Sequence, residues 1–291
     1  MKIWPDCIPC ISKMGLEVMR TVTRDERVLS RFVTEILELK PLRGEDYSIT
    51  SPELTRDVWS KIRKFSGMED PLKAKKEEQN RTALSIYARA KEVVERKSDP
   101  VGEALKLSIL GNSMDSMVGM GGFTGEEIVK LLQESQIDAQ AVEELKKKIF
   151  KARKIVYLGD NCGEIVFDKL FIEILRNFCD TEMIYITRTV PILNDALLED
   201  ALSVGMNGVV RVMENGIPEP FPGTVIEKVS EEVRNLIEDS NLVISKGLGN
   251  YDSLSEDENL RGKISFLLRG KCYPSCAAHG VPFGSLIVHH F

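Results

Sequence analysis

The stretch VYLGDNCGEI, residues 156–165, decides the fold class. An apolar run ends at Leu158, and two adjacent oxygen-bearing side chains, Asp160 and Asn161, follow before a glycine and a helical pattern. A short apolar run that is bounded by turn residues and followed by a helix is typical of a buried strand in a parallel sheet. Ligands bind beyond the carboxyl ends of such strands. The two polar side chains therefore stand where a site is expected.

Similar apolar runs recur through the second half of the chain, separated by helical stretches. They are residues 155–158, 183–187, 208–212, 242–245, 264–267 and 286–288. This alternation predicts an α/β fold, with a Rossmann-like three-layer α/β/α domain over residues 151–291. The first half carries apolar residues at spacings of three and four among many charges, including residues 26–39, 52–65 and 72–95. We therefore predict a mainly helical domain over residues 1–150.

Composition narrows the class of function. The 291 residues are 43% hydrophobic, which is enough for a sizeable core. A net charge of -6 argues against a nucleic-acid partner, because such proteins usually carry a basic patch, and it favours small-molecule partners. The sequence has no apolar run of bilayer length and no signal-like start, so we expect a cytoplasmic protein without a membrane partner. The sequence does not indicate the oligomeric state.

A second polar pair, Asn194-Asp195, follows the second apolar run. Either pair would serve as an ordinary helix cap. Two acids and an asparagine amide converging at one sheet edge would instead suit a hard cation such as magnesium or manganese. The only histidines, His279, His289 and His290, lie near the carboxyl terminus, which argues against a His-rich zinc centre or a Ser-His-Asp triad.

A third polar segment, SKGLGN at residues 245–250, follows the fourth apolar run. It combines Lys246 with glycines whose backbone amides can form an anion-binding concavity, so a phosphate would fit there. A solvated lysine beside a plain turn is the alternative. No P-loop and no G-x-G-x-x-G motif occurs. Cys162 stands where a haloacid-dehalogenase-like phosphatase needs a second acid, so Asp160 is not assigned as a phosphorylated nucleophile.

The six cysteines include two close pairs, Cys7-x-x-Cys10 and Cys272-x-x-x-Cys276. Four thiolates could hold zinc or an iron-sulfur cluster if the two ends of the chain meet. Buried small hydrophobic side chains are the simpler interpretation, and the wider spacing of the second pair favours it. A non-catalytic metal- or cluster-binding protein is the hypothesis from a different class.

The three polar segments, LGDNCGE (158–164), PILND (191–195) and SKGLGN (245–250), in that order, resemble the metal-dependent damage-control phosphatases, formerly domain of unknown function 89, which have an acidic-residue-methyltransferase-like fold. GNSMD (111–115) and Lys271-Cys272 also look like family positions, and Cys7-x-x-Cys10 is similar to the stand-alone microbial branch. The resemblance spans roughly the whole chain.

The resemblance implies a divalent ion (Mn, Mg, Co or Ni) held by Asp160, Asn161 and Asp195, and hydrolysis of small phosphorylated metabolites, such as sugar phosphates or damaged metabolites, by metal-activated water. It places Lys246 near the substrate phosphate. Asp115 and Glu164 both remain candidates for base or outer-shell ligand. A carboxyl methyltransferase activity, described for a eukaryotic relative, is the alternative, although no glycine-rich methyl-donor loop is present. The expected catalytic residues are Lys246 and Asp160, and the expected substrate contacts are Asn112, Asp115, Lys246, Gly247, Gly249 and Asn250.

Overall fold

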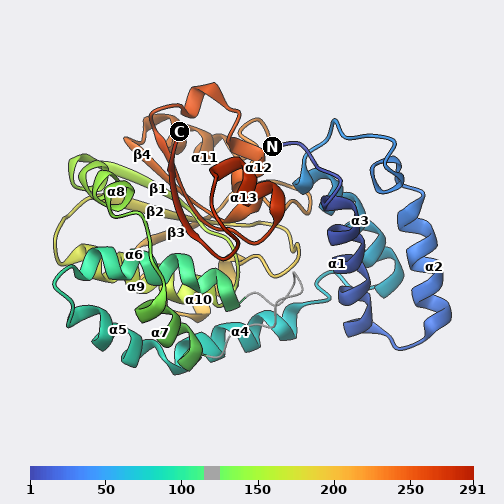
Figure 1. The fold of residues 1–291 in the computed structure, drawn as a ribbon, viewed down its shortest axis with the longest axis horizontal. Coiled ribbons are helices and arrows are strands. Elements are labelled where there is room, and N and C mark those ends of the chain that lie inside the picture. The colour runs from blue at the N-terminus through green and yellow to red at the C-terminus, as the bar shows by residue number, and fades with distance from the viewer. Residues whose placement is uncertain (115–124) are drawn as a thin grey trace.

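The computed structural model describes residues 1–114 and 125–291 and confirms a mixed α/β fold (Figure 1). One sheet contains six strands in the order β3-β2-β1-β4-β5-β6, and only β6 is antiparallel to its neighbour among them. The strands are β1 (Lys154–Leu158), β2 (Glu182–Thr187), β3 (Arg211–Glu214), β4 (Leu242–Lys246), β5 (Ile264–Arg269) and β6 (Leu286–His290).

Helices cover both faces of this sheet, which explains why its strands are continuously apolar. In β1, Ile155 and Tyr157 pack into the core on one face, whereas Val156 and Leu158 pack into the core on the other. The first face carries α4 (Lys73–Ser85), α5 (Tyr87–Glu95), α6 (Pro100–Gly111), α7 (Gly125–Glu134), α8 (Ala139–Lys151), α9 (Glu164–Arg176) and α10 (Leu198–Ser203). The second face carries α11 (Glu231–Asp239) and α12 (Gly247–Leu254).

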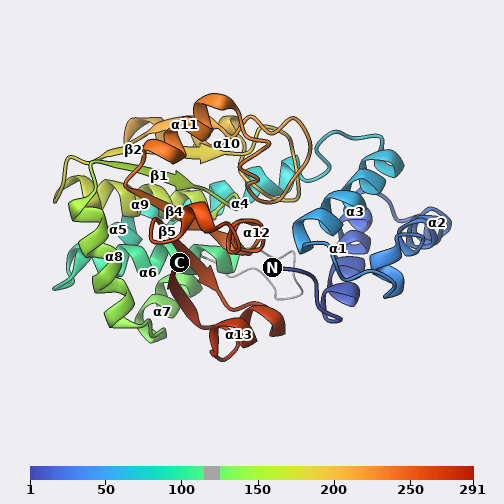
Figure 2. The ribbon, with the colours of Figure 1, turned by 90° about the horizontal axis from the view of Figure 1, so that it is seen from above.

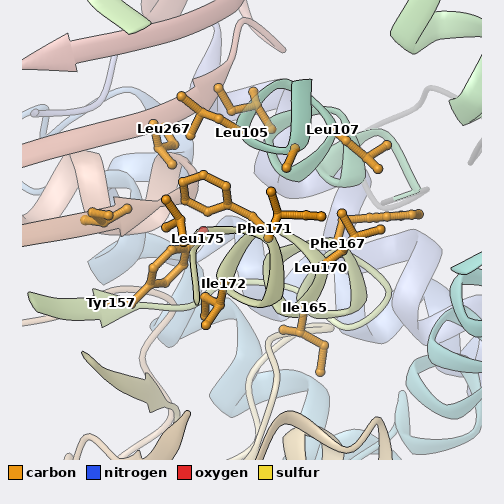
Figure 3. Close-up of a cluster of buried hydrophobic side chains, with 14 of the residues drawn as sticks. Leu105, Leu107, Tyr157, Ile165, Phe167, Leu170, Phe171, Ile172, Leu175 and Leu267 are labelled. Atoms are coloured by element: carbon orange, nitrogen blue, oxygen red, sulfur yellow. The ribbon is translucent and has the colours of Figure 1, made fainter. Parts of the chain in front are cut away.

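Close packing of α6 on α9 forms the centre of the larger core. Figure 3 shows Leu105 and Leu107 of α6 facing Phe167 and Phe171 of α9. The two helices approach so closely at Gly111 that a Cβ atom there would lie 2.7 Å from Phe167 Cδ2. This contact holds the end of α6 beside the start of α9, which follows the Asp160 segment.

The first three helices have a core of their own. They are α1 (Cys7–Val22), α2 (Glu26–Leu37) and α3 (Ser51–Ser66), and both views show them gathered at one end of the molecule (Figures 1 and 2). Helices α4 to α8 precede residue 150 but share a core with the sheet. The division into residues 1–150 and 151–291 stays a prediction.

Two local expectations differ from the structure, and one helix had no predicted bounds. The third strand begins at Arg211, because Met206–Gly208 forms a 3-10 turn. The helical pattern of residues 72–95 is divided between α4 and α5 at Ile86, whose ψ of 0° leaves helical geometry. Helix α1, which contains the first cysteine pair, was not predicted. In the part of the chain that the structure describes, no helix combines the length and apolarity needed to cross a bilayer.

Strand order places a crevice where the predicted residues lie. The chain steps from β1 to β2 and β3 on one side, and β4 and β5 continue on the other side of β1. The connections after β1 and β4 therefore diverge, and such a switch point is where open α/β sheets bind ligands. Helix α13 (Tyr273–His279), between β5 and β6, completes the fold.

Candidate active site

The segments after β1 and β2 are joined by backbone hydrogen bonds. Ala196 N donates to Asp160 O at 2.8 Å, and Cys162 N donates to Asn194 O at 2.9 Å. Between these bonds, Asn161 and Asp195 form an isolated antiparallel bridge. The structure therefore brings together the three predicted ligands, Asp160, Asn161 and Asp195.

Neither polar pair caps a helix. The N-cap of α9 is Gly163, with φ of 80° and no side-chain cap bond. The N-cap of α10 is Leu197, whose backbone N–H donates to Asp200 Oδ2 at 2.9 Å. Capping, the alternative that the sequence left open, does not account for Asp160 or Asp195.

Two asparagine amides surround the Asp160 carboxylate. Asn161 Nδ2 donates to Asp160 Oδ2 at 2.8 Å, and Asn112 Nδ2, at the C-cap of α6, donates to the same oxygen at 3.2 Å. Asn112 Nδ2 also lies 2.6 Å from Glu164 Oε2. The predicted residue Asn112 thus reaches the site through the packing of α6 on α9, and Glu164 joins the same network.

Arg188 is a site residue to which sequence reasoning gave no role. Its Nε donates to Asp195 Oδ2 at 2.7 Å, its Nη1 donates to Asn250 Oδ1 at 3.1 Å, and its Nη2 lies 3.7 Å from Asp160 Oδ1. The side chain is 3% exposed. Its position immediately after β2, seven residues before Asp195, was the available signal. Arg188 thus orients Asp195 by a hydrogen bond and attracts Asp160 by charge.

The segment that carries Asp195 is anchored in the core of the first three helices. Trp59 Nε1 of α3 donates to Pro191 O at 3.0 Å, and Ile192 is buried in that core. Leu193 packs against the same core and has φ of 46°, a left-handed conformation that costs a non-glycine residue about 1 to 2 kcal/mol. The helical unit therefore holds a strained loop beside the predicted ligand.

The residues present fit a hard divalent cation. Desolvation by burial, followed by the nearby carboxylates of Glu164 and Asp195, raises the pKa of Asp160 well above its usual range. A cation would relieve this repulsion, and carboxylate and amide oxygens are the donors that Mg²⁺ and Mn²⁺ prefer. Within residues 1–114 and 125–291, no three His, Cys, Asp or Glu side chains form a ready metal cluster. The predicted set instead combines two carboxylates with one amide, whose oxygen would have to turn toward the ion.

These groups border a cavity of about 190 Å³ between the strand ends, α1 and the start of α13. Its polar wall includes Asn112, Asp160, Asn161, Asp195 and Lys271. The positive charge of Lys271 partly offsets the rise in the pKa of Asp160. The lining also includes apolar and sulfur-bearing side chains, which are Cys7, Cys10, Ile11, Met14, Leu193, Pro222, Leu248 and Cys272.

Comparison with known protein families gives a match that includes both the helical half and the sheet of this chain. The family model described as "Damage-control phosphatase ARMT1-like domain" matches residues 3–287. The chain belongs to this damage-control phosphatase family. The family resemblance seen in the sequence is confirmed, whereas assignment to a branch through Cys7-x-x-Cys10 stays a prediction.

Relatives at full length agree with the family. A damage-control phosphatase of Archaeoglobus fulgidus is 31% identical over 99% of this chain and 98% of its own length, and one of Pyrococcus horikoshii is 30% identical over 99% and 97%. The crystal structure of a DUF89 family protein from Pyrococcus horikoshii superposes with a TM-score of 0.85 at 26% identity, covering 100% of this chain and 99% of that one. The names of the two sequence relatives support a phosphatase-type activity.

Lys246, predicted to contact phosphate, lies outside the cavity lining of this family member. Its side chain is 0% exposed at the end of β4. Nζ contacts Asp168 Oδ1 at 2.6 Å, Glu164 Oε1 at 2.8 Å, and the backbone and hydroxyl oxygens of Ser108 at 2.8 Å each. An ammonium has three N–H donors, and hydrogen bonds to Asp168 and to the two oxygens of Ser108 engage all of them, so Glu164 Oε1 is held by an ion pair. A phosphate contact by Lys246 stays a prediction and would require at least one of these bonds to be exchanged.

The other predicted substrate contacts lie at different depths. Gly249 lines the cavity, and Gly247, with φ of 79°, lies directly against the Asp160 carboxylate. Asn250 is 0% exposed. It accepts a hydrogen bond from Arg188 and donates to Gly159 O and Lys246 O, so it connects the ends of β1 and β4. Asp115 lies outside the described residues.

The structure brings three of the four paired cysteines into the cavity wall. Cys7, Cys10 and Cys272 line it, whereas Cys276 lies against Gly270. All are free thiols. Desolvation by burial raises the pKa of each of the three, that of Cys272 to about 12, and neighbouring thiols add smaller contributions for Cys10 and Cys272. Binding of a metal or cluster by these thiols stays a prediction.

Proposed function

We propose that the protein is a divalent-metal-dependent phosphatase that hydrolyses small phosphorylated metabolites, such as sugar phosphates or damaged metabolites. One observation carries the proposal: Asp160, Asn161 and Asp195, from the ends of two neighbouring strands, border one cavity together with a lysine. Carboxylate and amide oxygens beside a cationic side chain suit a metal ion and a phosphate bound next to each other.

Each residue has a defined part in this chemistry. Asp160, Asn161 and Asp195 would hold the ion (Mn, Mg, Co or Ni), and Arg188 keeps both carboxylates in place. A divalent ion supplies charge neutralisation for phosphoryl oxygens and lowers the pKa of water. Lys271 faces the cavity, so it is better placed than Lys246 to donate to a phosphoryl oxygen as charge builds up on it.

The size of the cavity limits the substrate. Its volume of about 190 Å³ lies below the range of about 300 to 1,000 Å³ that is typical of drug-sized sites. A small phosphate ester fits these dimensions better than a nucleotide or a polymer does. The apolar side chains of the lining, such as Ile11, Met14 and Leu248, give the rest of the substrate a surface that excludes water.

Phosphate release tests the proposal. Metal-stripped protein is screened against a panel of sugar phosphates and other small phosphate esters, with Mn²⁺, Mg²⁺, Co²⁺ or Ni²⁺ added singly. We expect turnover only with a divalent ion, and its loss in Asp160→Asn but not in the control Asp239→Asn on the exposed end of α11. Full turnover in excess chelator, or in Asp160→Asn, would exclude the proposed role of the ion.

A further inference from the structure

Lys246 is the buried centre of a polar network beneath the site. Besides its contacts with Ser108 and Glu164, it pairs with Asp168, which is 0% exposed. Asp168 is held independently by the hydroxyls of Tyr157, at 2.9 Å, and Tyr185, at 2.8 Å. These donors come from β1 and β2, so Asp168 is a fixed anchor for the ammonium.

Glu164 connects this anchor to the site. Its Oε1 contacts Lys246, and its Oε2 accepts from Asn112 Nδ2 at 2.6 Å and from Asn161 Nδ2 at 3.4 Å. The same two amide nitrogens donate to Asp160 Oδ2. Glu164 is 1% exposed. A continuous chain of contacts therefore runs from Asp168 through Lys246 and Glu164 to the amides that hold Asp160.

We infer that Lys246 is a positioning residue that acts through Glu164. By holding one oxygen of that carboxylate, it aims the other at Asn112 and Asn161 and thereby fixes Asp160 for the ion. This inference rests on the proposed function, because it assigns the network to the metal site. The inference predicts the sign of the change in metal affinity when the lysine is removed. Loss of a nearby positive charge alone would tighten binding of a cation, whereas loss of positioning weakens it.

The test measures binding of Mn²⁺ by titration calorimetry, and binding of orthophosphate to the Mn²⁺-saturated protein, in Lys246→Met, Glu164→Gln and the double variant. Changes in residues that orient metal ligands typically cost about 10- to 100-fold in affinity. We expect Mn²⁺ to bind about 10- to 100-fold more weakly in each single variant. The double variant should bind no more weakly than the worse single one, because both changes break the same chain of contacts. Lys91→Met, which removes a surface partner of Glu173, is the control and should bind as wild type does.

Several results would overturn the inference. They are unchanged Mn²⁺ affinity in Glu164→Gln, tighter Mn²⁺ binding in Lys246→Met, additive losses in the double variant, or weaker orthophosphate binding with normal Mn²⁺ affinity in Lys246→Met. The last result would return Lys246 to a phosphate-binding role. If Lys246→Met does not fold, the double variant, which removes one charge of each sign, decides the question: Mn²⁺ affinity as weak as in Glu164→Gln supports the inference, and a return to wild-type affinity overturns it. Wild-type protein that binds none of Mn²⁺, Mg²⁺, Co²⁺ and Ni²⁺ would overturn the proposed function and this inference together.

Discussion

Replacing Gly247 with alanine is a direct test of the geometry at Asp160. A Cβ atom on Gly247 would lie 1.9 Å from Asp160 Oδ2 and 2.3 Å from its Cγ. At such separations the carboxylate must move. A matched control exists in Gly262, which has nearly the same φ, 77° against 79°, but no atom within 4 Å of the added Cβ.

The expected losses of stability and of metal affinity follow from backbone strain and from the hydrogen bonds that the Asp160 carboxylate loses. Both variants should lose about 1 to 2 kcal/mol of stability, because alanine is strained in the left-handed region. In Gly247→Ala, the displaced carboxylate also leaves the amides of Asn112 and Asn161, and hydrogen bonds to a charged group contribute about 1.5 to 3 kcal/mol each. The lower limit for two bonds, about 3 kcal/mol, corresponds to a loss of metal affinity of more than 100-fold.

Thermal unfolding and titration with Mn²⁺ separate the two effects. We expect metal-free Gly247→Ala to unfold at a lower temperature than Gly262→Ala, because it also loses the two amide bonds to Asp160, and we expect a large loss of Mn²⁺ affinity in Gly247→Ala alone. Equal, wild-type-like affinity in both variants would refute the view that Asp160 is a ligand held in this position.

Two further predictions concern other acids of the cavity. Asp195→Asn should keep the fold, because Arg188 retains its bonds to Asn250, but should weaken Mn²⁺ binding by at least about 100-fold in calorimetry, the upper end of the loss typical for an outer-shell residue; unchanged affinity would leave Asp195 with a structural role only. Burial and the charge of Glu256 raise the pKa of Asp252 from 3.8 to about 7. The folded state therefore binds more protons than the unfolded state between about pH 4 and 7, so Asp252 lowers stability progressively across that range, by at most about 4 kcal/mol above it. Asp252→Asn should raise the free energy of unfolding at pH 8 but not at pH 3, as urea titrations would show, and equal effects at both pH values would contradict this reasoning.

The position of the candidate site was predictable from the sequence because strand ends are local signals. The apolar run before Asp160 and the polar residues after it depend on neighbours in the chain, and parallel strands bring their carboxyl ends to one edge. The convergence of Asp160, Asn161 and Asp195 follows from these two facts. The role of Arg188 did not follow, because which acid a cation meets depends on how two loops join.

The direction of the Lys246 side chain shows where such reasoning stops. Side chains alternate along a strand, so Lys246 points to the same face as Ile244, which packs in the core with α6 and α9. The sequence shows the alternation but not which face carries the cavity. A lysine at a strand end was therefore expected in the crevice, although Asp168 and Glu164 hold it inside the protein.

The strained loop at Leu193 connects the core of the first three helices to the candidate metal ligand Asp195. Ile192 and Leu193 pack in this core, which keeps the backbone of Leu193 in its left-handed conformation. The loop would relax if the helices separated from it. A ligand that binds Asp195 in its present position therefore stabilises the packing of the three helices on this loop. Because coupling between two equilibria is reciprocal, packing of the helices raises the affinity for that ligand by the same free energy. Protease resistance of α1, α2 and α3 should thus rise when the site is filled, and core substitutions in these helices become a remote means of tuning affinity.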